Sequence, residues 1–118
     1  MSWEILLIRT IENNEEVNEI EADNIVPFKK TEIADEIKKI ATTMKVEYDC
    51  EHLEWQAIVG NDEWDIEFSL EECEENETVM LHVRGNEETS EALKMLANDL
   101  GARLLECCTG DFIELDNL

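Results

Sequence analysis

The chain has 118 residues, which suits one domain, and 43% of them are hydrophobic, enough to fill a core. Nine lysines and arginines stand against 31 aspartates and glutamates, so the formal net charge is −22. A surface of this sign repels nucleic acids and anionic membranes, and it attracts basic proteins. We therefore expect a single domain over residues 1–118 that binds neither nucleic acid nor membrane.

The cysteines and the apolar runs indicate a cytoplasmic protein. Residues 1–10 lack the basic start and the cleavage site of a secretory signal, and no apolar run approaches the ~20 residues of a membrane-spanning helix. Cys50, Cys73, Cys107 and Cys108 do not have the spacing of a disulfide framework, and adjacent cysteines bridge only with strain. We expect reduced thiols in a reducing compartment.

The N-terminal part predicts a strand, a loop and a helix. Residues 3–9 are apolar on both faces, which is typical of a central strand covered on at least one side. Residues 11–24 are rich in Glu and Asn without a sustained period, so we expect a mobile acidic loop. A helix follows Pro27, with Thr31 as its expected N-cap. Its buried stripe is predicted from apolar residues at helical spacing: Ile33, Ile37, Ile40 and Met44.

From Trp55 onward the apolar residues alternate with polar ones, which predicts strands. Trp55, Ala57 and Val59 fall on one face of the first strand, and a turn follows. Residues 64–70 form the clearest half-buried strand, because its second face is acidic. A charged connection over residues 71–77 leads to the next strand. That strand covers residues 78–84.

The C-terminal part predicts a helix over residues 89–100, ended by Gly101. A strand over residues 103–107 follows, in which Cys107 occupies a core position. After a turn at Thr109 and Gly110, residues 112–115 are expected to form a last short strand.

These elements run in the order β-α-β-β-β-α-β-β and predict an α+β fold. Amphipathic helices among amphipathic strands favour a two-layer sandwich, a mainly antiparallel sheet with two helices on one face. A ferredoxin-like topology is the alternative.

Clustered carboxylates are the most prominent candidate binding feature. One set lies on a predicted exposed strand face (Glu63, Asp65, Glu67) and the other in one short loop (Glu71, Glu72, Glu74, Glu75). Charge of one sign steers association, so these sets predict docking of a basic protein. The alternative is a solvated acidic surface without a specific partner.

Tryptophan supplies a candidate anchor for such a partner. We expect Trp3 and Trp64 to be core residues. Trp55 follows polar, irregular sequence, so we predict that it is a partly exposed aromatic anchor.

A metal site or a catalytic site is a weaker hypothesis. Cys50 and His52, together with Cys107 and Cys108, offer ligand types for zinc but not the usual spacing of a zinc knuckle. Residues 61–65 resemble the start of a calcium loop, yet the central Gly and the closing Glu are missing. Neither a nucleophile elbow nor a phosphate-binding loop is present. We therefore expect no enzymatic activity and no cofactor; a self-associating scaffold is a further alternative.

Short stretches spread along the chain resemble one protein family. They are Met1-Ser2-Trp3-Glu4-Ile5, Ile25-Val26-Pro27-Phe28, Ile66-Glu67-Phe68, Leu81-His82-Val83-Arg84-Gly85, Gly101-Ala102-Arg103-Leu104-Leu105-Glu106 and Thr109-Gly110-Asp111-Phe112-Ile113. Together they resemble a family of small acidic bacterial proteins, and chains of this style are grouped with immunity proteins of polymorphic toxin systems. The resemblance implies a protein that blocks a basic toxin such as a nuclease. It brings no catalytic residue to this sequence, and Cys107 and Cys108 depart from the acid and small residue that similar chains have there.

Overall fold

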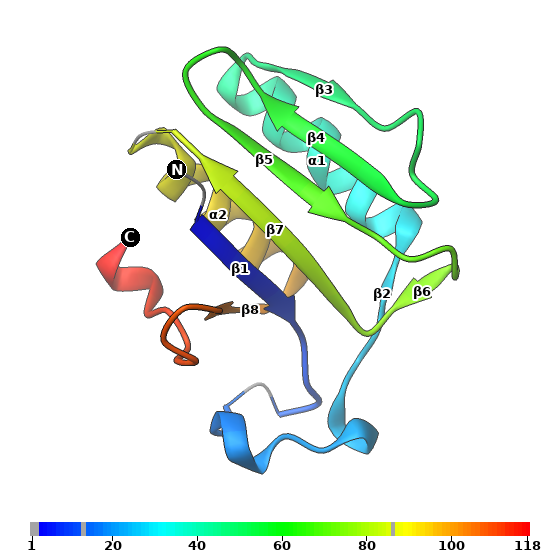
Figure 1. Ribbon diagram of the computed structural model, residues 1–118, viewed down its shortest axis with the longest axis vertical. Coiled ribbons are helices and arrows are strands. Elements are labelled where there is room, and N and C mark those ends of the chain that lie inside the picture. Colours follow the sequence, from blue (N-terminus) through cyan, green and yellow to red (C-terminus); the bar gives the residue numbers. More distant parts are fainter. Residues whose placement is uncertain (1–2, 13, 86) are drawn as a thin grey trace.

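A computed structural model describes residues 3–12, 14–85 and 87–118 (Figure 1). Met1, Ser2, Asn13 and Asn86 lie outside the described residues, which includes one position of the predicted loop over residues 11–24. Within the described ranges, a six-stranded sheet has the strand order β3-β4-β5-β7-β1-β8, and every neighbouring pair is antiparallel. Figure 1 shows both α-helices on the same side of this sheet. The predicted fold class, a two-layer α+β sandwich, is confirmed.

The elements have the following bounds. The main sheet contains β1 (Trp3–Ile8), β3 (Glu47–Asp49), β4 (Gln56–Gly60), β5 (Asp65–Ser69), β7 (Thr78–Arg84) and β8 (Arg103–Glu106). A second small sheet pairs β2 (Phe28–Lys29) with β6 (Glu75–Asn76). The helices are α1 (Lys30–Met44) and α2 (Glu88–Leu100), and there are short 3-10 turns, η1 (Val17–Glu19), η2 (Ala22–Asn24) and η3 (Leu115–Asn117).

The core lies between the sheet and the two helices because both layers carry the expected periodicity. Burial alternates along β5 and β7 with a period of two, and Ile5 and Leu7 of β1 are fully buried. Trp3 of β1, which was expected in the core, is only partly buried. On α1, Ile33, Ile37 and Ile40 are fully buried at helical spacing, as predicted. Burying each such side chain stabilises the fold by about 1.5–3 kcal/mol.

Part of the fold has the ferredoxin-like topology that was the alternative prediction. This part consists of β1, β5, β7 and β8 with both helices. β1 and β5 are parallel across β7, and the chain passes between them through α1; β7 and β8 are parallel across β1 and are joined by α2. This is the split βαβ arrangement. The β3–β4 hairpin extends the sheet beyond β5, so the molecule is wider than that topology alone.

Three local predictions differ from the structure. Residues 112–115 are not a strand: Phe112 forms an isolated bridge with Leu105, and η3 follows. β8 ends at Glu106, so Cys107 is exposed in a turn instead of in the core. The N-cap of α1 is Lys29 rather than Thr31, because the Lys29 N–H donates to Glu32 Oε2 at 2.9 Å one turn into the helix.

Three short strands were also missing from the prediction. β3 has three residues that are all exposed, and β2 and β6 have two residues each, so none of them shows a period of two. The predicted charged connection therefore contains β6. Residues 11–24 carry η1 and η2, and Thr10 bridges Ile25 across the base of this segment. Mobility of the segment stays a prediction.

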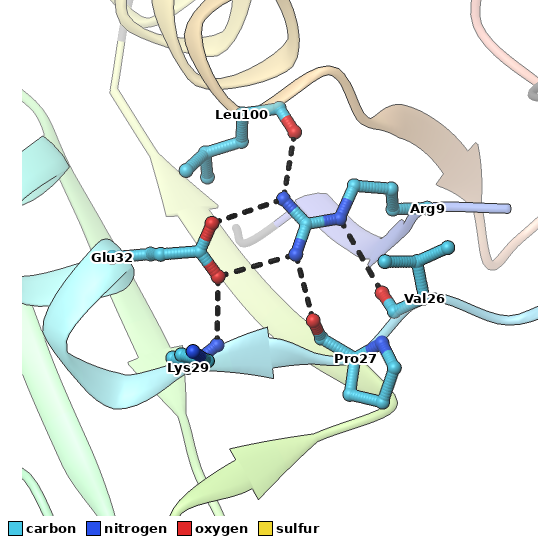
Figure 2. A network of polar contacts seen from close by, with 6 residues as sticks. All are labelled: Arg9, Val26, Pro27, Lys29, Glu32 and Leu100. Atoms are coloured by element: carbon cyan, nitrogen blue, oxygen red, sulfur yellow. Dashed lines mark hydrogen bonds and ion pairs between the residues drawn. The ribbon is translucent and has the colours of Figure 1, made fainter. Parts of the chain in front are cut away.

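A single arginine joins the ends of several elements (Figure 2). The Arg9 guanidinium donates to both carboxylate oxygens of Glu32, at 3.2 and 3.1 Å. It also donates to three carbonyl oxygens, those of Leu100 at 2.9 Å, Pro27 at 2.7 Å and Val26 at 3.4 Å. These bonds tie the end of β1 to the first turn of α1 and to the last turn of α2.

Candidate functional site

Trp55 is an exposed aromatic side chain at a fixed backbone position. It is 52% exposed, and it lies in the turn before β4, which begins at Gln56. Its carbonyl accepts the Leu70 N–H at 2.9 Å, and its own N–H donates to the His52 carbonyl at 3.0 Å. The His52 ring lies 5.4 Å from the Trp55 ring, centre to centre. Trp55 therefore does not continue the buried face of Ala57 and Val59, and its predicted partial exposure is confirmed; its role as an anchor stays a prediction.

The acidic loop begins directly after Leu70, so it lies beside Trp55. Its carboxylates are exposed: Glu71, Glu72, Glu74 and Glu75. We call this loop together with Trp55 the Trp55 corner. It is found in Figure 1 where the chain leaves β5 and enters β6. Trp55 and Leu70, which the acidic loop follows, are 15 positions apart in the sequence. They are neighbours because β4 and β5 form a hairpin in which Gln56 pairs with Ser69.

A buried asparagine fixes the shape of the acidic loop. Asn76 is 2% exposed, its Oδ1 accepts the Glu71 N–H at 2.7 Å, and its Nδ2 donates to the Cys73 carbonyl at 3.2 Å. From the other side, the Lys30 N–H donates to the Glu74 carbonyl at 3.1 Å. Three backbone polar groups of the loop are thus bonded within the protein, while the glutamate side chains are exposed. Asn76 is a residue that sequence reasoning missed.

The other predicted acidic set is divided by the structure. Asp65 and Glu67 lie on the sheet face away from the helices, where Arg84 donates to both, at 3.0 and 3.2 Å. These two hydrogen bonds raise the pKa of Arg84. Glu63 is exposed in the turn before β5, at the opposite end of that strand from Glu71. Asp65 and Glu67 are therefore already paired with a cation, unlike the carboxylates of the Trp55 corner.

A contact between a histidine and a carboxylate lies on the same sheet face. The His82 Nδ1 is 3.7 Å from a Glu4 carboxylate oxygen, and His82 and Glu4 face each other across β7 and β1. This weak contact does not create a nucleophile or a base with a defined partner.

The cysteine and histidine residues proposed for zinc do not meet. Cys50 and His52 follow β3 at one edge of the sheet, and Cys107 and Cys108 follow β8 at the other. Five strand spacings separate these edges, about 24 Å. All four cysteines of the chain are unpaired thiols. Among the described residues, no group of three or more His, Cys, Asp or Glu side chains could hold a metal ion.

The half-buried Cys50 and the exposed Cys107 both have thiols whose pKa is raised, which makes them poor nucleophiles. Burial raises the pKa of Cys50, and burial together with the nearby Glu4 carboxylate raises the pKa of Cys107. Cysteine reacts as the thiolate, so both side chains are held in the less reactive form. Cys107 Sγ lies 3.8 Å from Met80 Sδ.

The stretch that resembles a calcium loop has another role. The Asn61 side chain accepts the Glu63 N–H at 2.8 Å and the Trp64 N–H at 3.0 Å, which makes it a turn-forming residue between β4 and β5. Its side-chain oxygen therefore stabilises the hairpin.

Two surface hollows lie at different places on the described part of the chain. A hollow of about 320 Å³ lies beside Arg103, whose guanidinium stacks 3.5 Å from the Phe112 ring centre and donates to the Glu15 carbonyl at 2.7 Å. The Arg103 guanidinium therefore already contacts groups of the protein itself, the Phe112 ring and the Glu15 carbonyl. A second hollow of about 250 Å³ is acidic and lies against β3 and β4.

Comparisons with protein-family models, with curated proteins and with solved structures each found no match to this chain. No helix in the described part of the chain is long and apolar enough to cross a membrane.

Proposed function

We propose that this protein is a protein-binding module that docks a basic protein partner at the Trp55 corner. One observation carries the proposal: a half-exposed indole lies beside a loop whose carboxylates have no ion pair among the described residues and whose backbone is fixed by Asn76. The resemblance suggests the biological form, an immunity or inhibitor protein that neutralises a basic toxin in the cytoplasm. The proposal assigns no catalytic activity and no cofactor.

The two parts of the corner would contribute in different ways. Tryptophan is enriched among the residues that dominate interface energetics, because its large apolar ring is desolvated while its N–H keeps a polar partner. Exposed rim carboxylates contribute mainly to the association rate, since they attract a basic partner over a distance. A fixed loop lowers the conformational entropy that binding must remove.

The first test is affinity capture from the host lysate at low and then moderate salt, followed by purification of the recovered basic protein and kinetic binding measurements. Trp55→Ala should raise Kd by about tenfold or more, mostly through faster dissociation. Changing Glu71, Glu72, Glu74 and Glu75 together to Gln should slow association about fivefold.

The matched control is a second quadruple variant in which Glu12, Glu16, Glu19 and Glu21 become Gln. These exposed residues lie in the segment around η1 and η2, away from the corner, and the change in net charge is identical. If both quadruple variants slow association equally, only total charge acts and the corner is not the site. Recovery of no basic protein at moderate salt, or an unchanged Kd for Trp55→Ala, contradicts the proposal.

A further inference from the structure

A glutamate is buried in the seam between the two helices. Glu36 of α1 is 6% exposed, and its Oε1 has no hydrogen-bond partner among the residues that the structure describes. Its carboxyl shares a hydrogen bond with Asp99 of α2. Lys39, one turn further along α1, places its Nζ 2.8 Å from Asp99 Oδ2. These three side chains form a polar contact between helices that also bury apolar residues such as Ile37 and Leu96.

Two carboxyl groups can share a hydrogen bond only if one of them carries a proton. Asp99 is the ionised member, because Lys39 neutralises it and lowers its pKa. Glu36 is the protonated member: burial, and then Asp99, raise its pKa to about 7, while Lys39 opposes the shift. The protonation state of the buried group therefore changes near neutral pH.

No other charged side chain compensates Glu36 within the described residues. The strands packed against α1 bring the buried Ala57 and Val59 of β4. The charged residues of the shorter strands, Lys29 on β2 and Glu47 and Asp49 on β3, are exposed. Loss of the Glu36 proton thus leaves two carboxylates facing one ammonium group, and the buried Oε1 of Glu36 has no donor among the described residues.

We propose that Glu36, Asp99 and Lys39 form a pH-sensitive latch between α1 and α2, closed while Glu36 carries the proton that it donates to Asp99 and loosened when that proton leaves to solvent. The latch makes the helix layer less tightly packed as the pH rises through neutrality. The latch does not involve the Trp55 corner, so an experiment that contradicts the latch does not contradict the proposed function.

The first experiment follows glutamate side-chain carboxyl resonances by NMR as the pH is raised from acid to alkaline values. One resonance should titrate near neutral pH in the natural protein and be missing in Glu36→Gln. If every glutamate resonance titrates together in the ordinary acid range, the latch does not exist. This measurement needs no variant to detect the titration.

The second experiment measures amide hydrogen exchange in α1 and α2, corrected for the intrinsic pH dependence of exchange. Protection should fall about tenfold between roughly pH 6 and pH 8, as expected for a single group whose pKa is 7 when folded and 4.5 when unfolded. Glu36→Gln should abolish this fall, since the amide keeps a donor for Asp99 without a titrating proton. The control Glu91→Gln, at an exposed position of α2, should keep it. An equal fall in both variants overturns the latch.

Discussion

At the residue scale, Arg9 shows how a charged side chain is accommodated inside this fold. Its guanidinium meets a carboxylate with two hydrogen bonds and uses its remaining N–H groups on three carbonyls (Figure 2). The planar fork of arginine can satisfy all of these acceptors at once, whereas a lysine ammonium cannot. The two carbonyls next to α1 and the carbonyl at the end of α2 come from segments far apart in the sequence. Arg9 therefore contributes to tertiary structure more than to any one element.

The first prediction concerns the carboxylate that Arg9 binds. The Arg9 hydrogen bonds, with help from the Lys29 N–H, hold the pKa of Glu32 below its ordinary value of 4.5. The folded protein therefore binds fewer protons at this site than the unfolded chain does. The stabilisation is complete above about pH 4.5 and is lost as the pH falls through the lower folded value. Glu32→Gln should lower the free energy of unfolding at neutral pH and lose less on acidification than the natural protein.

Urea unfolding followed from neutral to acid pH measures this difference. Glu12→Gln, at an exposed position, is the control and should keep the full acid-side loss. Identical pH profiles for the two variants would mean that Arg9 does not couple to the ionisation of Glu32. Glu36 acts in the opposite direction, since its raised pKa makes its contribution decline as the pH increases from 4.5 through 7.

At the element scale, the hairpin around Trp64 depends on two glycines. Gly60 and Gly85 flank the buried Trp64, which is 1% exposed, and both have positive φ, 146° and 123°. A Cβ on Gly85 would lie 2.4 Å from Trp64 Cβ and 2.5 Å from its Cα. These atoms belong to the core and the backbone, so they cannot move aside at low cost.

We therefore expect Gly85→Ala to lower the free energy of unfolding by about 3 kcal/mol or more, from strain added to an unfavourable backbone conformation. Gly101→Ala is the matched control: Gly101 ends α2 with φ 61°, and a Cβ there meets no atom within 4 Å. Gly101→Ala should lower the free energy of unfolding by about 1 kcal/mol, because only the left-handed backbone conformation is then unfavourable. Equal losses for the two variants in chemical denaturation would show that the contact with Trp64 does not matter.

Element length explains which parts of the fold the sequence could predict. β5, β7 and α1 are long enough for apolar positions to repeat several times, and their buried faces follow the predicted periods; Met44, which was predicted to be buried, is only partly so. β2, β3 and β6 contain two or three residues, and pairing with a distant segment defines them. A strand was predicted at Phe112 because this residue is apolar, but in the structure its ring stacks on the Arg103 guanidinium.

The candidate site likewise has features that the sequence pattern predicts and features that only tertiary contacts define. Exposure of Trp55 could be predicted from the irregular polar residues before it, and the acidic loop from its composition. Their proximity depends on the register of the β4–β5 hairpin, and the role of Asn76 depends on burial. A polar residue within a run of glutamates offers no signal that it is the buried one. Arg84 likewise pairs with Asp65 and Glu67 only through strand register.

At the scale of the whole molecule, both sheet edges are arranged in ways that discourage pairing between copies. The outer edge of β8 is covered by the C-terminal segment, in which the Glu106 N–H donates to Asp111 O at 2.9 Å and the Ile113 N–H donates to Leu104 O at 2.8 Å. The other edge, β3, is short and carries Glu47 and Asp49. Short, charged edge strands resist edge-to-edge association, and these would face the same charge on a second copy.

The net charge of −22 makes the stability of the whole fold depend on salt. Nine basic residues cannot neutralise 31 acidic ones, so repulsion among carboxylates exceeds the attraction in ion pairs such as Lys39 with Asp99. Folding brings these carboxylates closer together, and salt screens their repulsion over a Debye length of about 10 Å at 0.1 M. The melting temperature should therefore rise when sodium chloride is raised from low to moderate concentration.

Scanning calorimetry of the natural protein and of the variant with Glu12, Glu16, Glu19 and Glu21 changed to Gln tests this balance. The variant has four fewer negative charges, so its melting temperature at low salt should be higher and its gain with salt smaller. Light scattering on the same samples should give the mass of a single 13.7 kDa chain at low salt, because copies repel each other. A melting temperature that falls with salt would show that the internal ion pairs outweigh the repulsion, and a dimer at low salt would require an apolar interface strong enough to overcome it.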